Sequence, residues 1–398
     1  MPNRPMARNL LLLMACQAIG QAGNTMMFVA TALAVSGVLG IQDLATLPVT
    51  MQHLGVMLSV FPAAMLMQRK GRRFGFRLAS VMGMLGSSVC ALGLYSGQFL
   101  VMCLGGLILG YAVASTQMYR FAAVELAAPA MRAKAISWVT AGGVVAGIIG
   151  PVLARMTHDM WVPIYTATYV AMIGVHAVVF IVMGFIRFPP PVAKVAEPVG
   201  GVSRPLWIIA TQRDYMVAVI AAMIAFGTMS FVMSAAPLAI VGCGLPHTEA
   251  HWVIFVHVMG MFVPSFFTGN LIQRYGVVNI MLLGTAVFGV AAAVGLGGTN
   301  EWHFRIALCL NGVGWNFLFV GATTLVTTAY RPSERGKAQA LNDFLVFGTT
   351  TTCSLLAGIL QNRLGWFPLN WLSLGLVAVA VAAVGWLWTR RRLEVAAA

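Results

Sequence analysis

Charged side chains are scarce in this sequence. Asp, Glu, Lys and Arg make up 9% of the 398 residues, whereas hydrophobic residues make up 60% and the mean hydropathy is +0.87. A soluble domain carries about 25% charged residues, which it needs to cover its surface. The chain is therefore not a set of soluble domains, and we expect lipid to contact most of its surface.

Several chemical signatures are also absent from the sequence. The six cysteines include no Cys-x-x-Cys pair, which argues against a disulfide framework and a zinc site. No Gly-x-x-x-x-Gly-Lys loop for ATP, no paired carboxylates and no catalytic serine turn stand out. The net charge of +14 comes from Lys and Arg scattered in short gaps, so nucleic acid is not an expected partner. We therefore do not expect an enzyme, and a membrane enzyme or metal-binding assembly factor is the weakest alternative.

Twelve apolar runs are long enough to cross about 30 Å of hydrocarbon as helices. Strands of an outer-membrane barrel would instead alternate over about ten residues, so helices are expected. We predict an all-α membrane protein with twelve transmembrane helices. Their approximate bounds are 9–40, 44–67, 76–96, 98–122, 135–157, 161–186, 213–241, 248–271, 277–297, 302–329, 337–361 and 366–389.

The longest polar stretch divides these runs into six plus six. It lies between Arg187 and Arg213 and is rich in proline and glycine, which is typical of a linker. We predict an N-terminal six-helix bundle over residues 1–190, a cytoplasmic linker over 191–209 and a C-terminal six-helix bundle over 210–398.

The basic residues predict the orientation in the membrane. With the N-terminus inside, only Arg155, Arg305 and Arg363 of the 24 Lys and Arg lie in outer gaps, and the other 21 (24 − 3) lie in inner gaps. This distribution follows the positive-inside rule. Both termini of this multi-pass protein are therefore expected in the cytoplasm.

The two halves repeat one loop. Ala64-Met-Leu-Met-Gln68-Arg69-Lys70-Gly71-Arg72-Arg73 follows the second run, and Gly269-Asn-Leu-Ile-Gln273-Arg274-Tyr275-Gly276 follows the eighth. Both resemble the major facilitator superfamily signature Gly-x-x-x-Asp-Arg-x-Gly-Arg-Arg, with Gln68 and Gln273 in place of the acid. By helix count and symmetry the resemblance covers the whole chain. It implies two pseudo-symmetric bundles with a substrate site between them near the membrane midplane.

Two pairs of residues in the seventh and eighth runs suggest a soft metal site. Met229 and Met233 are four residues apart, as are His257 and Met261, so each pair shares one helix face. Counted from the outer helix ends, Met233 is level with His257, and Met229 is level with Met261. Thioether and imidazole ligands suit Cu(I) better than Mg²⁺ or Ca²⁺. Methionine is also a common filler of helical cores, so packing remains an alternative.

The same pattern in a twelve-helix major facilitator is similar to that of the CcoA-like copper importers, which supply copper for assembly of cbb3-type cytochrome c oxidase. The resemblance implies that Met229, Met233, His257 and Met261 bind a copper ion as Cu(I), which the protein imports across the bacterial inner membrane. We expect no organic cofactor, a monomer in the lipid bilayer, and copper chaperones as partners. Because close relatives in the same branch carry riboflavin, a transporter of an organic solute such as riboflavin or a drug is the alternative.

Other polar residues within the runs are further candidates. His53 and Met57 lie at nearly the symmetry-related place of His257 and Met261 and form a candidate second stop for the metal, although a lone helical histidine is more often hydrogen-bonded to a neighbour. Candidate cavity-lining residues for an organic solute are Gln17, Asn24, Gln117, Asn311, Trp315 and Asn316. Candidates for gating or coupling are Arg69, Arg120, Glu125 and Asp343.

Overall fold

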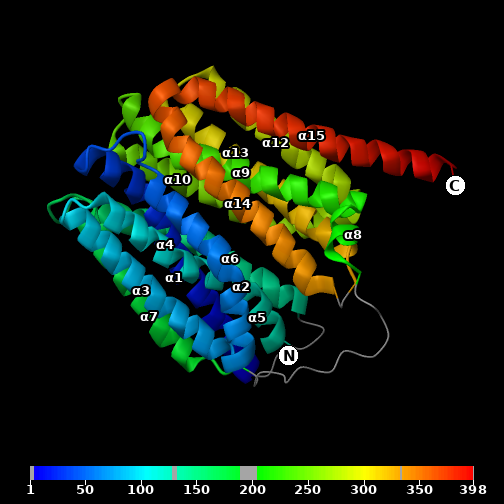
Figure 1. Ribbon diagram of the computed structural model, residues 1–398, viewed down its shortest axis with the longest axis horizontal. Helices are drawn as coiled ribbons and strands as arrows, with labels where there is room; N and C mark the ends of the chain where they lie inside the picture. The colour runs from blue at the N-terminus through cyan, green and yellow to red at the C-terminus, as the bar shows by residue number, and fades with distance from the viewer. Residues whose placement is uncertain (1–3, 128–131, 189–203, 332–333, 398) are drawn as a thin grey trace.

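The computed structural model describes residues 4–127, 132–188, 204–331 and 334–397, which form fifteen α-helices. Two bundles lie one above the other in Figure 1, with α1 to α7 in the first and the later helices in the second. The helices of the first bundle are α1 (Arg4–Val38), α2 (Leu47–Lys70), α3 (Arg72–Tyr95), α4 (Phe99–Thr116), α5 (Tyr119–Leu126), α6 (Arg132–Thr157) and α7 (Thr166–Phe185). Those that follow are α8 (Leu206–Ala210), α9 (Arg213–Gly242), α10 (His247–Phe262), α11 (Ser265–Tyr275), α12 (Val277–Gly297), α13 (Glu301–Thr328), α14 (Arg335–Leu364) and α15 (Trp366–Ala397).

The chain crosses the membrane as helices because the hydrocarbon core offers the backbone no other hydrogen-bond partners. Eleven helical stretches of the described residues are long and apolar enough to cross a membrane, and Gly142–Thr157 of α6 is a shorter apolar helix. The predicted all-α fold with two six-helix bundles is confirmed. The protein is a multi-pass membrane protein. The predicted linker over 191–209 is only partly described: residues 189–203 lie outside the described residues, and α8 occupies its last part.

Two predicted helices are divided in the structure and three have ends that differ by five residues or more; of these, α1 begins at Arg4 rather than 9 and α15 ends at Ala397 rather than 389. The fourth divides into α4 and α5 at Gln117–Met118, and the eighth divides into α10 and α11 just before Ser265. The sixth begins at Thr166 rather than 161, because the segment before it turns through Pro163 and through Tyr165, which has a left-handed φ of 69°. Apolar composition predicts where a membrane crossing lies, but it does not reveal a break in the helix.

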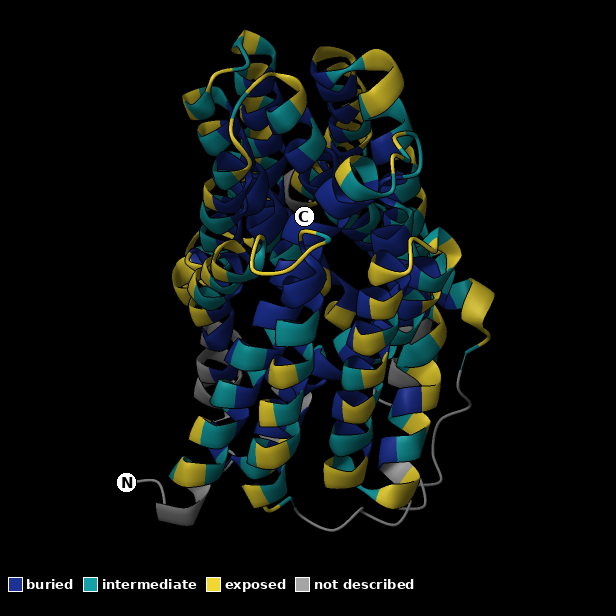
Figure 2. Cartoon of the chain, turned by 90° about the vertical axis from the view of Figure 1, so that its left-hand side faces the viewer, coloured by how far each residue is buried: buried dark blue, intermediate teal, exposed yellow. Residues whose placement is uncertain are grey.

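Buried side chains lie on the helix faces that are turned toward the middle of the molecule, and exposed side chains lie on the outward faces (Figure 2). The most extensive contacts between the bundles are those of α2 with α14 and of α6 with α10, and α1 also contacts α9. Gly143 of α6 allows the second pair to approach closely, since a Cβ there would lie 2.7 Å from Cδ1 of Phe262. The space between the bundles is therefore bounded by closely packed helices on two sides.

The N- and C-termini lie on the same side of the molecule, which we call the terminal face (Figure 1). Hydrogen bonds join the two bundles on the other side, which we call the opposite face. Nη2 of Arg363 donates to Oδ2 of Asp43 over 2.9 Å, and the Thr46 hydroxyl donates to the Ser354 carbonyl over 2.9 Å. Tyr165 and His247 are also bonded across the interface, over 3.2 Å. The hydrogen bonds from Arg363 and Asn362 lower the pKa of Asp43, so this contact persists at neutral pH. The structure is closed at the opposite face.

Ion pairs near the terminal face stay on one side of the interface. Arg72 is paired with Glu125 within the first bundle, and Arg391 is paired with Asp214 within the second. Arg204 donates to the buried carboxylate of Glu334 over 2.6 Å, which lowers the pKa of Glu334 and ties the residues just before α8 to the start of α14. None of these three ion pairs therefore joins the two bundles, in contrast to the contacts at the opposite face.

The repeated loop provides a test of the fold. Gly71 and Gly276 separate consecutive helices with nearly the same backbone angles, φ 87° and ψ 157° against φ 85° and ψ 149°. Only glycine adopts this region readily, and a side chain there costs roughly 1–3 kcal/mol. We expect Gly71→Ala and Gly276→Ala each to lower the melting temperature of the detergent-purified protein. Gly269→Ala is the control, because this glycine lies within α11 with open space around it; an equal loss there would contradict the explanation.

Candidate functional site

A cavity of about 220 Å³ lies between the bundles and is lined by residues of both. At about 30 Å³ per water this is space for roughly seven waters, somewhat smaller than the pockets of about 300–1,000 Å³ that usually hold drug-sized ligands. The helices that contribute most of its wall are α1, α2 and α4 from the first bundle and α9, α10, α13 and α14 from the second. A cavity between two repeats is the expected place for a transporter's substrate.

The first bundle contributes the polar part of the wall. Gln17, Gln21, Asn24 and Thr25 lie on successive turns of α1, so one face of this helix is polar along the cavity. Such a stripe is unfavourable against lipid, and the fold places it against the cavity instead. His53 of α2, Thr116 of α4 and Gln117 complete this side.

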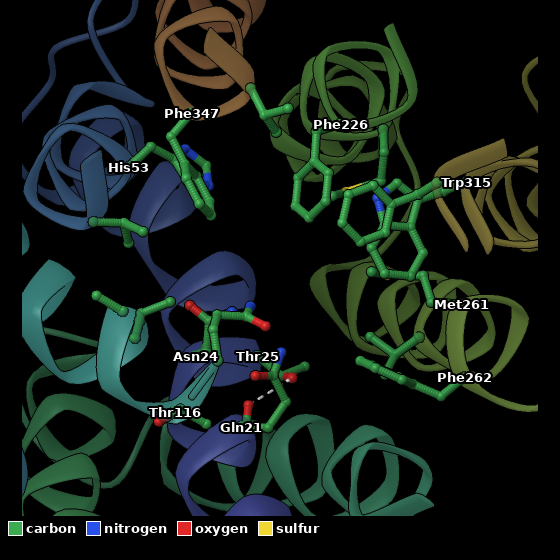
Figure 3. Close-up of a pocket in the computed structure, with 18 of the residues that line it drawn as sticks. Gln21, Asn24, Thr25, His53, Thr116, Phe226, Met261, Phe262, Trp315 and Phe347 are labelled. Carbon is green, nitrogen blue, oxygen red and sulfur yellow. Dashed lines mark hydrogen bonds between the residues drawn. The ribbon is translucent and has the colours of Figure 1, made fainter. Parts of the chain in front are cut away.

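The second bundle contributes an aromatic and thioether wall. The rings of Trp315 and Phe319 are stacked, with centroids 5.2 Å apart and an interplanar angle of 18°. Phe226 packs edge-on against both, at 5.2 and 4.6 Å. Phe347 lies 5.8 Å from Phe226, and Phe262 lies 6.4 Å from Trp315. Figure 3 shows Phe226, Trp315 and Phe262 on the side of the cavity opposite to Gln21, Asn24 and Thr25.

Some polar atoms of the lining have no hydrogen-bond partner among the described residues. They include Oδ1 of Asn24, Nδ1 of His53 and Nε1 of Trp315, all of which are buried. An unsatisfied buried polar atom costs about 1–3 kcal/mol, so such atoms are normally bonded to protein, water or a ligand. Of these atoms, Asn24 Oδ1 can accept a hydrogen bond and Trp315 Nε1 can donate one.

The structure places three of the four proposed metal ligands on the cavity wall. Met229 and Met233 of α9 and Met261 of α10 line it, as the matched depths predict. His257 is fully buried behind the wall, where its Nδ1 is 2.8 Å from the Leu308 carbonyl. The Nδ1 contact of His257 joins α10 to α13, and its Nε2 is buried without a hydrogen-bond partner among the described residues.

The other predicted lining residues are mostly found at the cavity. Gln17, Asn24, Gln117, Trp315 and Asn316 line it. Asn311 is buried on α13 but is not among the lining residues. His53 lines the cavity, with its ring 5.7 Å from that of Phe28, whereas Met57 lies next to Gly348 of α14. Sequence reasoning missed Phe226, Phe262, Phe319 and Phe347, because phenylalanine within an apolar helix carries no signal that separates a cavity wall from a lipid-facing surface.

The gating candidates lie in different surroundings. Glu125 accepts hydrogen bonds from Arg72, the shortest being 2.7 Å, so this pair connects α5 to α3 within one bundle. Arg69 is exposed, and the side chain of Arg120 lies outside the described residues. Asp343 of α14 lines the cavity and accepts a 3.0 Å hydrogen bond from Asn342. Of these residues, Asp343 alone is among the lining residues.

Asn316 of α13 supports the break between α10 and α11. Its Nδ2 donates to the Met261 carbonyl over 2.7 Å and to the Ser265 hydroxyl over 2.6 Å, while its Oδ1 accepts from Thr268 over 2.6 Å. Pro264 lies at the break and has no N–H to continue the helix. Asn316 therefore satisfies polar groups that the break exposes, and it does so beside the cavity.

Comparison with known proteins agrees with this architecture. The profile of the Major Facilitator Superfamily matches residues 13–213 and 218–397, nearly the whole chain. The chain belongs to the major facilitator superfamily. Like other members it is a membrane transporter and not an enzyme. The fold resembles that of a point mutant of the nucleoside transporter NupG, with a TM-score of 0.72 at 12% identity over 94% of this chain and 98% of that one.

Two relatives have similar lengths. The riboflavin transporter RfnT of Brucella anthropi is 38% identical over 376 residues, which is 94% of each chain. The uncharacterized MFS-type transporter YddS of Bacillus subtilis is 24% identical, over 98% of this chain and 92% of that one.

The similarity to RfnT corrects the expected cargo. The prediction of a copper importer for cbb3-type cytochrome c oxidase is wrong, because a relative with 38% identity over 94% of the chain is a riboflavin transporter. The organic-solute alternative agrees better with this finding. The Met/His pattern does not identify a metal site, because methionine side chains also line apolar cavities. Their spacing alone does not distinguish a metal ligand from a lining residue.

The role of Asn316 can be tested in this facilitator. We expect Asn316→Leu to lower the free energy of unfolding by about 1–3 kcal/mol, because the Met261 carbonyl and the Ser265 hydroxyl lose their partner, whereas the Thr268 hydroxyl keeps the Pro264 carbonyl. Thermal unfolding of the purified protein measures this loss. Asn311→Leu, on the same helix, is the control, because Oδ1 of Asn311 has no partner among the described residues. Equal destabilisation of the two variants would show that Asn316 does not specifically support the break.

Proposed function

We propose that the protein is a secondary transporter that carries a flavin, with riboflavin as the first candidate, through the central cavity by alternating access. The observation that carries the proposal is the pairing of an aromatic wall from the second bundle with an amide-rich wall from the first. The similarity to a riboflavin transporter along almost the whole chain supports the same cargo.

The two walls suit the two parts of riboflavin. Its tricyclic ring is flat and aromatic, and such rings stack on Trp and Phe at centroid distances of about 4.5–7 Å. Its ring edge carries amide-like donors and acceptors, and its side chain is a polyol. These groups can bond the amide side chains of Gln17, Gln21 and Asn24, which line the cavity. The cavity thus offers stacking on one side and hydrogen bonds on the other.

The transport mechanism follows from the closed opposite face. The buried hydrogen bond of Thr46 to the Ser354 carbonyl and the exposed pair of Asp43 with Arg363 join the two bundles there. Rocking of one bundle against the other would break these contacts and expose the cavity at the opposite face. We propose that the terminal face is cytoplasmic and that the membrane is the bacterial inner membrane, because 21 of the 24 Lys and Arg lie in the gaps of that face. Since one chain forms the whole cavity, we propose that the monomer is the working unit.

Trp315 provides the first test of the cargo. We expect Trp315→Ala to weaken riboflavin binding by about tenfold or more, since it removes the ring that stacks on Phe319 and faces the cavity. Quenching of riboflavin fluorescence by the purified protein measures the Kd, and uptake of radiolabelled riboflavin by cells that lack their own transporter measures function. Trp302→Ala is the matched control, because Trp302 lies on the same helix but is 59% exposed. The proposal is wrong if wild-type protein neither binds nor transports riboflavin.

The methionines provide a second test. We expect the double variant Met229→Leu/Met233→Leu to keep riboflavin uptake within about twofold of wild type, because leucine preserves the apolar volume of the wall while removing both thioethers. A copper chelator in the medium should likewise leave uptake unchanged. Met261→Leu, which is on the same wall but on α10, serves as the comparison. If the double variant lost uptake at equal membrane abundance, the methionines would not act merely as apolar lining of the cavity.

A further inference from the structure

A second hollow, of about 690 Å³, lies on the outside of the first bundle near the terminal face, away from the central cavity. We call it the basic groove. Its cations are Lys70 at the end of α2 and Arg73 and Arg77 on the first turns of α3. Its apolar wall includes Phe74 and Val81 of α3 and Phe180 of α7. The groove therefore joins a cluster of positive charge to an apolar surface that continues along α3 and α7.

The three cations are held in the groove by apolar and carbonyl contacts. The guanidinium of Arg77 lies 4.0 Å from the centroid of the Phe180 ring, and its Nε is buried without a hydrogen-bond partner. Nη2 of Arg73 donates to the Gly184 carbonyl of α7. The Lys70 ammonium lies 5.0 Å from the Phe74 ring. Among the described residues, no Asp or Glu forms an ion pair with any of the three, so their charge is available to a ligand.

The internal repeat shows that the fold does not require this charge. Gly71 and Gly276 occupy equivalent turns, which sets an offset of 205 (276 − 71) between the bundles. The positions equivalent to Lys70, Arg73 and Arg77 are Tyr275, Val278 and Leu282. The second bundle thus makes the same turn and the same helix start without a cation at any of the three positions. The cations belong to the first bundle alone.

The position of the groove indicates the ligand. The groove begins where α2 ends and α3 begins, which is where a membrane-spanning helix reaches the headgroups, and its exposed apolar side chains include Phe74 (45%) and Val81 (41%). Basic pockets between transmembrane helices at this depth suit anionic lipid headgroups. A soluble anion has no use for the apolar wall, whereas a phospholipid has both a phosphate and acyl chains.

We propose that the basic groove binds an anionic phospholipid, with the phosphate held by Arg73, Arg77 and Lys70 and an acyl chain along Phe74, Val81 and Phe180. The lipid would also fix the start of α3, where Arg72, the neighbour of Arg73, is paired with Glu125 of α5. This binding is independent of the solute in the central cavity.

Native mass spectrometry of the detergent-purified full-length protein tests the site, with phosphatidylglycerol as the probe and phosphatidylcholine as the neutral lipid. We expect phosphatidylglycerol to bind wild type more tightly than phosphatidylcholine does. The variant Arg73→Gln/Arg77→Gln should bind phosphatidylglycerol about 25-fold more weakly, because it removes two cations and each cation near a membrane surface contributes about fivefold to the affinity. Inorganic phosphate at the same concentration should not displace the lipid.

Two further variants make the result specific. Arg390→Gln/Arg392→Gln removes two exposed cations from the end of α15 and should leave the affinity for phosphatidylglycerol within about twofold of wild type. Lys70→Gln/Arg73→Gln changes only exposed side chains and repeats the test if loss of the half-buried Arg77 prevents folding. The proposal is overturned by equal losses in the groove and α15 variants, by equal binding of the two lipids to wild type, or by displacement of the lipid by free phosphate.

Discussion

The inability of the hydrocarbon core to accept or donate a hydrogen bond is the constraint on which the rest of this structure depends. Most hydroxyls within the helices satisfy it locally: Thr31 donates to the Met27 carbonyl and Thr350 to the Val346 carbonyl, each over 2.7 Å. Where a helix breaks, at Pro264, Asn316 provides the missing partners from a neighbouring helix. Amides that have no such arrangement, such as Asn24, lie at the cavity, where water or a solute can bond them. The polar stripe of α1 is therefore tolerated because the two bundles leave a space in front of it.

The internal repeat supplies the same geometry twice, but its chemistry has diverged. Gly71 and Gly276 make nearly identical turns, and each bundle lends helices to the interface. Yet the cavity is polar on the side of the first bundle and aromatic on the side of the second. A solute with one flat apolar part and one hydrogen-bonding part can then contact both walls at once. Because the two parts contact different rigid bodies, rocking of the bundles changes both sets of contacts at once.

The sequence alone predicts the fold, because the length of each hydrophobic segment and the distribution of positive charge are properties of whole segments. A single atypical residue does not change either of them. The sequence also predicts much of the polar wall, since Gln17 and Asn24 are too costly to face lipid. It does not predict the aromatic wall, because Phe226 and Phe347 would look the same in the primary structure if they faced lipid. The cargo was misjudged for a related reason: Met229 and Met233 have the spacing of ligands, and that spacing also places them side by side on a wall. His257 has the predicted depth but is buried and is not among the residues that line the cavity, a placement that only the tertiary structure reveals.

The charged pair at the opposite face contributes little to holding the bundles together. The Asp43–Arg363 pair at the opposite face is well exposed, at 40% and 66% of the side chains, and exposed pairs contribute only about 0–1 kcal/mol. The contact of α6 with α10 at Gly143 and Phe262 is apolar and close, and it lies next to the cavity because Phe262 is also a lining residue. A solute can shift the equilibrium between conformations only if it binds one of them more tightly. A molecule that touches the aromatic wall alone moves with the second bundle and leaves the equilibrium unchanged, whereas one that also bonds the amides of α1 favours the conformation in which the two walls are the right distance apart.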